Sequence, residues 1–193
     1  LASGSADPVS TNESLDGGFS TKDIRLDLAY FDLGFQRAPG LHLLGGKIQN
    51  PYYTPGGTEL IWDSDLNPEG GALRYSGKSG GVKLFTNIGG FWVEERSSDV
   101  DTWLFGAQGG VELAFPDKKG SFTAGAAYYN YENARGQSPI FDSDDPFGNS
   151  VDEAGRYLHD YDLVELFGEL KIQAGSVPVA VFVDYVKNVA EGE

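Results

Sequence analysis

The sequence of 193 residues contains no cysteine and only two histidines, His42 and His159. The lack of cysteine excludes a disulfide, a thiolate zinc site and a cysteine nucleophile, and two histidines are too few for a multi-histidine metal centre. Basic residues are also scarce: 14 Lys and Arg stand against 29 Asp and Glu, which gives a net charge of −15. Such a chain repels nucleic-acid phosphates, so we expect no nucleic acid among its partners.

Long apolar runs are missing as well. No stretch of about 18 consecutive apolar residues occurs, so no transmembrane helix can be drawn. Methionine is absent, and residues 1–19 show no basic region followed by an apolar core, so no secretory signal is visible. We therefore expect the chain to be an interior part of a longer protein. What is abundant is glycine, with 27 residues, and aromatic side chains, at 13%. This pairing indicates a β-protein with many strands and turns.

Apolar and polar residues alternate with a period of two, which is typical of strands. In the stretch 101–115, Trp103 and Phe105 fall on one face, and Gln108 falls on the other. The first strand is expected to place Tyr30 on its apolar face and Ala29 on its polar face. We predict eight strands, most of them longer than the roughly 5 to 6 residues usual in soluble sheets. They lie near residues 20–34, 41–49, 70–77, 81–95, 101–115, 121–132, 162–174 and 177–189.

The connections between these strands alternate in length. Short turns follow the first, third, fifth and seventh strands, and longer segments follow the second, fourth and sixth. One end of the sheet should therefore carry tight turns and the other long loops, which is the sequence signature of an outer-membrane β-barrel. A soluble β-sandwich also alternates, but here the apolar faces are long enough to cross a bilayer. The predicted long-loop segments are 1–19, 50–69, 96–100 and 133–161.

We predict an all-β fold, an antiparallel transmembrane β-barrel that forms a single domain over residues 1–193. A sheet that spans a membrane must close, because unpaired backbone groups are costly in hydrocarbon. Neither end of the chain resembles the end of a barrel, so we expect the eight strands to be part of a larger barrel of about 16 strands.

The sequence gives little support to a nucleotide-binding site or to an enzyme active site. Residues 72–79 nearly match a phosphate-binding loop, but Ala72 replaces its first glycine, and a strand rather than a helix is predicted after Ser79. No Gly-x-Ser-x-Gly motif occurs. Glu165 and Glu169 could form a carboxylate pair, but they share a polar strand face with Lys171, so lining a lumen is the simpler interpretation. We expect no enzyme.

An acidic run at residues 62–70 alternates oxygen-bearing side chains, which Ca²⁺ prefers as ligands. The calcium loop of an EF-hand needs glycine at its sixth position, where this run has Pro68. A metal site formed by Asp63, Asp65 and Glu69 therefore stays an alternative. The preferred interpretation is a constriction loop folded into a pore, opposite basic residues on the flanking strands. Its residues are Asp63, Asp65, Asn67 and Glu69.

A second acidic cluster contains Asp142, Asp144 and Asp145. As an external loop it needs no further explanation. At the mouth of a pore, however, such carboxylates would concentrate cations and exclude anions.

Several runs resemble a putative porin family of Gram-negative bacterial outer membranes. The most distinctive are Gly46-Lys47-x-x-Asn50-Pro51 and Trp62-Asp63-x-Asp65-Leu66-x-Pro68-Glu69-Gly70, and the similarity covers most of the chain. The resemblance implies an outer-membrane channel for small hydrophilic solutes, often assembled as a homo-oligomer, with the lipid bilayer as a partner. It implies no catalytic residues and no cofactor.

The leading hypothesis is thus a passive diffusion channel that prefers cations. Its water-filled lumen would be lined by Arg25, Asp27, Lys47, Arg74, Lys83, Asn87, Gln108, Glu112, Glu165, Glu169, Lys171 and Asp184. Two alternatives remain open at this point. One is a surface or adhesive protein whose barrel only anchors acidic, Ca²⁺-binding loops. The other is a soluble carbohydrate-binding β-sandwich that uses Trp62 and Tyr52 as stacking platforms.

Overall fold

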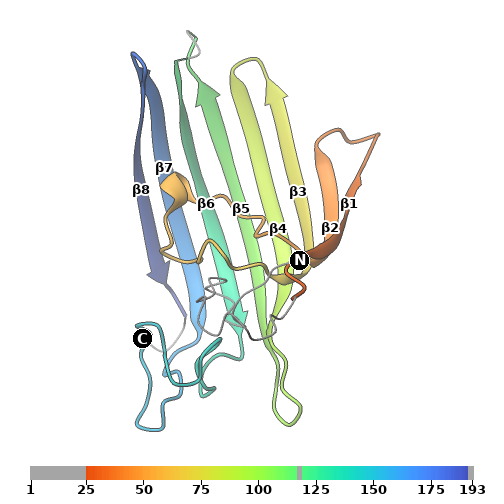
Figure 1. Cartoon of the computed structure of the whole chain (residues 1–193), viewed down its shortest axis with the longest axis vertical. Coiled ribbons are helices and arrows are strands. Elements are labelled where there is room, and N and C mark those ends of the chain that lie inside the picture. Colours follow the sequence, from red (N-terminus) through yellow and green to blue (C-terminus); the bar gives the residue numbers. More distant parts are fainter. Residues whose placement is uncertain (1–24, 117–118, 191–193) are drawn as a thin grey trace, which may run out of the picture.

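The computed structural model describes residues 25–116 and 119–190. They form one antiparallel sheet of eight strands that follow one another in sequence order (Figure 1). One short 3₁₀ helix, η1, covers Pro55–Gly57. The strands are β1 (Ala29–Gly34), β2 (Leu41–Lys47), β3 (Glu69–Ser79), β4 (Val82–Glu94), β5 (Thr102–Ala114), β6 (Gly120–Glu132), β7 (Tyr161–Ala174) and β8 (Val177–Asn188).

The prediction of eight antiparallel strands in an all-β fold is confirmed, while the sheet is open between β1 and β8. β4 to β8 have 12 to 14 residues each, which is more than the roughly 9 to 11 that a tilted transmembrane strand needs. Among the described residues, no helix has the length and apolar character required to cross a membrane.

The first strand is shorter than predicted. β1 begins at Ala29, and residues 26–28 are not in a strand; the predicted residues 20–24 lie outside the described part of the chain. Its faces also differ from the prediction. Since Ala29 pairs with Lys47 and Tyr30 with Gly46, Tyr30 shares a face with Asp32, and Ala29 shares one with Phe31. The predicted alternation does not extend through residues 26–30, because the backbone of residues 26–28 is irregular.

The short and long connections lie at opposite ends of the sheet (Figure 1). Residues 80–81 and 175–176 are two-residue hairpin turns, each with glycine at its first position and a positive φ, 60° at Gly80 and 64° at Gly175. Primed hairpin turns need this backbone conformation, which glycine adopts without steric cost. The near match to a phosphate-binding loop, residues 72–79, therefore lies within strand β3 and leads into the turn of the β3–β4 hairpin. We refer to the two ends of the sheet as the turn end and the long-loop end.

The two faces of the sheet differ in what covers them. The connection between β2 and β3, residues 48–68, crosses one face (Figure 1). We call this connection the inner segment and this face the inner face. The opposite, outer face is apolar and open; Val183 on β8, for example, is 64% exposed. Near its long-loop end the rings of Trp92 and Trp103 lie 4.7 Å apart.

Candidate functional site

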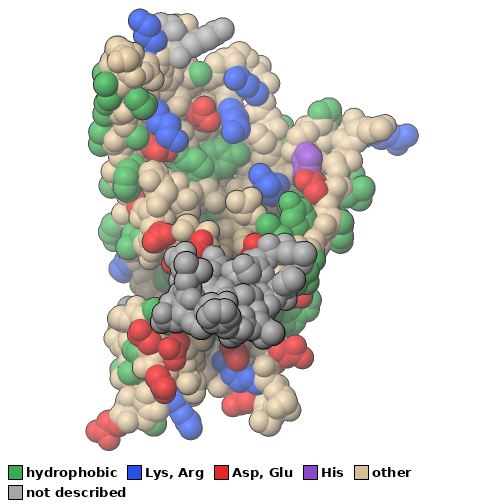
Figure 2. All heavy atoms as spheres, in the orientation of Figure 1, with side chains coloured by type: hydrophobic (Ala, Val, Ile, Leu, Met, Phe, Trp, Pro, Cys, Tyr) green, Lys and Arg blue, Asp and Glu red, His purple; other side chains and the backbone are tan. Residues whose placement is uncertain are grey.

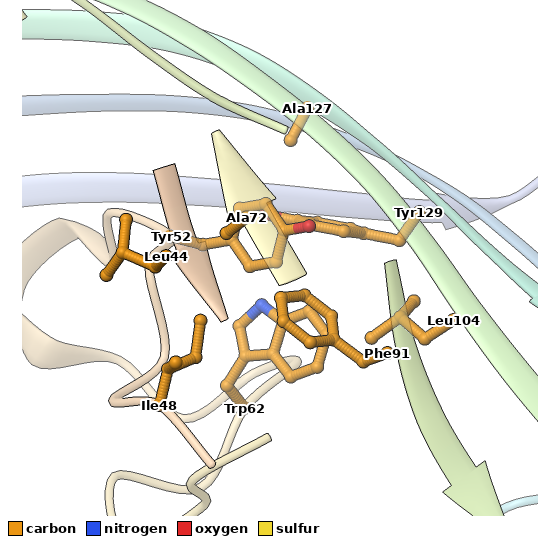
Figure 3. Packing of buried hydrophobic residues seen from close by; sticks show 9 residues of the cluster. All are labelled: Leu44, Ile48, Tyr52, Trp62, Ala72, Phe91, Leu104, Ala127 and Tyr129. Atoms are coloured by element: carbon orange, nitrogen blue, oxygen red, sulfur yellow. The ribbon is translucent and has the colours of Figure 1, made fainter. Parts of the chain in front are cut away.

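Two consecutive tyrosines, Tyr52 and Tyr53, anchor the inner segment to the middle of the sheet. We call the two positions on the sheet that receive their rings the seats of the inner segment. Tyr52 is buried at 7% exposure and belongs to the main hydrophobic core, which lies between the inner segment and the sheet rather than between two sheets (Figure 3). Its ring meets Tyr129 at 4.9 Å and Phe91 at 6.3 Å edge to face, and stacks on Trp62 at 5.6 Å. Edge-to-face and offset pairs of this kind add stabilisation beyond burial itself.

Glycine on the inner face makes room for Tyr52. A methyl group added at Gly106 would lie 2.2 Å from the Tyr52 hydroxyl and 2.8 Å from the Tyr129 ring. Both distances are below van der Waals contact, so no larger residue fits at Gly106 while Tyr52 stays in place. The absence of a side chain at this position of β5 is therefore what lets the inner segment lie against the sheet.

Tyr53 occupies a second seat two inner-face rows nearer the turn end. Its ring lies 5.5 Å from Phe85 of β4 and 5.5 Å from Phe167 of β7. Those two rings in turn lie over Gly110 and Gly125, where an added methyl would come within 2.3 Å and 2.4 Å of them. Two glycines between two phenylalanines in one cross-strand row thus create a slot that accepts the Tyr53 ring.

Gln108 holds the backbone of the same residue. The Tyr53 amide donates to Gln108 Oε1 at 2.7 Å, and Gln108 Nε2 donates to the Tyr53 carbonyl at 2.9 Å. Gln108 is itself almost fully buried and also contacts Asn87 and Tyr129. A side-chain amide carries both donors and an acceptor in a fixed planar geometry, so it substitutes here for a neighbouring strand.

Glu169 forms the third anchor, on β7. Its carboxylate accepts hydrogen bonds from the Tyr53 hydroxyl and from the Gly56 amide, and Lys171 lies 2.9 Å away as its ion-pair partner. Burial, and then the Glu169 carboxylate, raise the pKa of the Tyr53 phenol above its ordinary value, so the hydroxyl stays a donor at neutral pH. Gly56, with a φ of 62°, lies directly over the Phe182 ring of β8. The inner segment therefore reaches from β2 across to β8.

The acidic run lies in the return part of the inner segment. Asp63 shapes a local turn, because its side chain accepts from the Asp65 amide at 2.8 Å and its carbonyl accepts from the Leu66 amide at 3.2 Å. The Asn67 side chain donates to Asp27 at 2.8 Å, and Lys47 Nζ donates to the Asn67 carbonyl at 2.9 Å. The tyrosines, rather than these carboxylates, cross the middle of the sheet.

The described residues contain no group of three or more His, Asp or Glu placed to hold a metal ion. Asp63, Asp65 and Glu69 therefore do not form a ligand set in the structure, and the calcium alternative gains no support from it.

Most of the predicted lining residues lie on the inner face. The cross-strand register places eight of them on the same face as Gln108 and the seats of the inner segment: Arg74, Lys83, Asn87, Glu112, Glu165, Glu169, Lys171 and Asp184. Three predicted residues lie elsewhere. Arg25 forms an isolated bridge before β1, Asp27 contacts Asn67, and Lys47 pairs with Glu69 in a row that continues to the outer-face Trp92.

Charge is unevenly distributed along the strands. Basic side chains of the inner face extend from the middle of the sheet toward the turn end. Arg74 shares a row with Gln108, Lys83 shares one with Glu169, and Lys171 lies one row nearer the turn end. Acidic side chains gather at the long-loop end, as the lower part of Figure 2 shows. Connection 133–160 contributes Asp142, Asp144 and Asp145, which are exposed. The two ends of the inner face therefore offer different electrostatic environments.

The sequence alone did not identify the seats of the inner segment. Tyr52 and Tyr53 are the central contacts, and Gly106, Gly110 and Gly125 are the positions that receive them, directly or through a ring. A usable signal exists: these glycines stand at alternate positions on the polar faces of long strands, where side chains would otherwise fill the space. Glycine in a strand often marks close approach of another part of the chain.

The comparisons with known proteins agree with the resemblance noted from the sequence. Residues 1–154 match the model of a family described as putative porin. Neither the curated proteins nor the solved structures gave a significant match to the chain.

Proposed function

The chain belongs to the putative porin family, and we propose that it forms the wall of a passive diffusion channel for small hydrophilic solutes in a bacterial outer membrane. The observation that supports this most is the inner segment, held by Gln108 and Glu169 across a face lined with polar residues while the opposite face is apolar. A wall that separates lipid from an aqueous lumen has this asymmetry, with apolar residues outside and polar residues inside.

We further propose that the sheet is completed to a closed barrel of about 16 strands. In a barrel of about eight strands the interior is filled by side chains, whereas about 16 to 18 strands leave an aqueous channel. The inner face here carries a whole chain segment and, beside it, cavities of about 510 Å³ and 620 Å³. A barrel wide enough to hold these features and still conduct needs more strands than the eight of this sheet.

The arrangement favours a channel over the two other candidates. A soluble sandwich would bury its apolar faces between two sheets, but the described residues form a single sheet with an exposed apolar face. Trp62 and Tyr52 are buried in the core, so they are not free as stacking platforms for carbohydrate. A barrel that served only as an anchor would have no need of a segment anchored across its interior.

We propose that the channel prefers cations. The support for this is the net charge of −15 and the gathering of carboxylates at the long-loop end, which includes the exposed Asp142, Asp144 and Asp145. A mouth lined by one sign of charge raises the local concentration of the opposite ion.

Planar-bilayer recordings of the intact protein test the proposed channel and its proposed preference for cations. We expect discrete conductance steps and, in a salt gradient, a reversal potential of the sign set by cation flow. Absence of conductance would overturn the channel, and a reversal potential of the anion sign would overturn the selectivity alone.

A further inference from the structure

A cavity of about 510 Å³ lies on the turn-end side of the inner segment. Residues of β1 to β5 line it together with residues 49–53 of the inner segment. Its charged lining is balanced, with Arg74 and Lys83 against Asp32 and Glu112. A ligand that carries one positive and one negative charge would find an oppositely charged side chain for each of them. A simple anion would be repelled by the two carboxylates, and a simple cation by the two basic side chains.

The charges differ in how far they are already paired. Lys83 Nζ lies 3.8 Å from the Glu112 carboxylate, so these two charges offset each other. One oxygen of Asp32 lies 2.6 Å from His42 Nδ1, and its second oxygen has no hydrogen bond to the described residues. The Arg74 guanidinium makes no hydrogen bond or ion pair with any described residue. It therefore offers its full fork of donors to a carboxylate.

The sheet places these two open groups on different strands of the same cavity wall. Arg74 of β3 pairs with His42 of β2, and His42 pairs with Gly34 of β1, two residues from Asp32. β1 and β3 are two strand spacings apart, about 10 Å. Both side chains line the same cavity of about 510 Å³, which is large enough for a small molecule whose ammonium and carboxylate stand on the same carbon.

We propose that this cavity binds small zwitterions of the α-amino-acid type, with the carboxylate on Arg74 and the ammonium on the open oxygen of Asp32. The proposal rests on the proposed channel function and names a class of solute for it. A zwitterion has no net charge, so the acidic long-loop end does not exclude it as it would exclude a free carboxylate.

The test uses three matched ligands: alanine, propionate, which lacks the ammonium, and ethylamine, which lacks the carboxylate. Binding to the intact protein in detergent is measured by saturation-transfer NMR titration, which detects weak affinities. We expect alanine to bind at least several-fold more tightly than either of the others. Equal affinity of alanine and propionate would overturn the zwitterion and leave a simple anion site.

Two variants assign the ends of the ligand. Arg74→Gln should weaken alanine binding by roughly tenfold, the worth of a charge-assisted hydrogen-bonded pair, and Asp32→Asn should weaken it several-fold while keeping an acceptor for His42. Arg37→Gln is the matched control, because Arg37 is exposed in the turn between β1 and β2 and does not line the cavity. Unchanged binding in Arg74→Gln would overturn the site.

The binding titration and the bilayer recordings fail independently. If the protein binds alanine through Arg74 but does not conduct, the channel is wrong and the site stands. If it conducts but Arg74→Gln binds alanine like the wild type, the site is wrong and the channel stands.

Discussion

Gln108→Leu should loosen the inner segment without removing volume from the core. Leucine is close to glutamine in size but has neither donor nor acceptor, so both hydrogen bonds to the Tyr53 backbone, at 2.7 Å and 2.9 Å, are lost. A neutral hydrogen bond contributes about 0.5 to 1.5 kcal/mol net. Two of them amount to about 1 to 3 kcal/mol, which corresponds to an increase of roughly 5-fold to 150-fold in the population of the released segment.

Amide hydrogen exchange measured by mass spectrometry reports this population directly. Peptides that cover residues 48–60 should exchange faster by that factor in Gln108→Leu, while peptides from β6 and β7 should change little. Gln173→Leu is the control, because Gln173 is exposed and, among the described residues, its side chain donates to the Gly175 carbonyl and not to the inner segment. If exchange of residues 48–60 is the same in Gln108→Leu and wild type, the reasoning is refuted, and the aromatic seats alone hold the segment.

Three further predictions concern the seat, the outer face and the long-loop end. Gly106→Ala should push Tyr52 off the sheet at a cost of about 1 to 3 kcal/mol, and proteolysis of the inner segment should become faster. Gly109→Ala is the control, because its methyl would meet nothing closer than 3.7 Å, and it should leave the rate of proteolysis unchanged. Val183→Arg on the outer face should destabilise the membrane-inserted protein by up to about 2 to 4 kcal/mol, measured by folding into vesicles titrated with urea. Ala180→Arg on the inner face of the same strand should cost much less, and equal costs would contradict the assignment of the faces. Replacing Asp142, Asp144 and Asp145 together by Asn should move the reversal potential toward zero, and no shift would mean that these carboxylates lie away from the ion path.

Strand number and pairing could be predicted from the sequence because both depend on local signals. The alternation around Trp103 and Gln108 fixes which side chains share a face, and a glycine such as Gly80 or Gly175 fixes where a hairpin turns. The start of β1 was wrong because alternation around Tyr30 says nothing about whether a partner strand is present. Pairing with β2 begins only at Ala29.

The course of the inner segment was only partly predictable. Its acidic residues suggested a loop within a pore, but the seats depend on contacts distant in sequence, such as Tyr53 with Glu169, 116 residues apart. No periodicity within residues 48–68 encodes those partners. They become recognisable only when the register brings Gly110 and Gly125 into one row with Phe85 and Phe167.

The central claim is that the inner segment narrows an aqueous channel. Lys47 and Glu69 are paired, and the Ile48 amide donates to the Pro68 carbonyl at 2.9 Å, so a two-residue Asn-Gly turn could replace residues 49–67 and close a hairpin. The decisive measurement is the single-channel conductance of the intact protein with and without this replacement. The account predicts discrete channels in both proteins and a clearly larger conductance in the shortened one. An unchanged conductance would contradict the constriction, and a silent membrane with both proteins would contradict the channel itself.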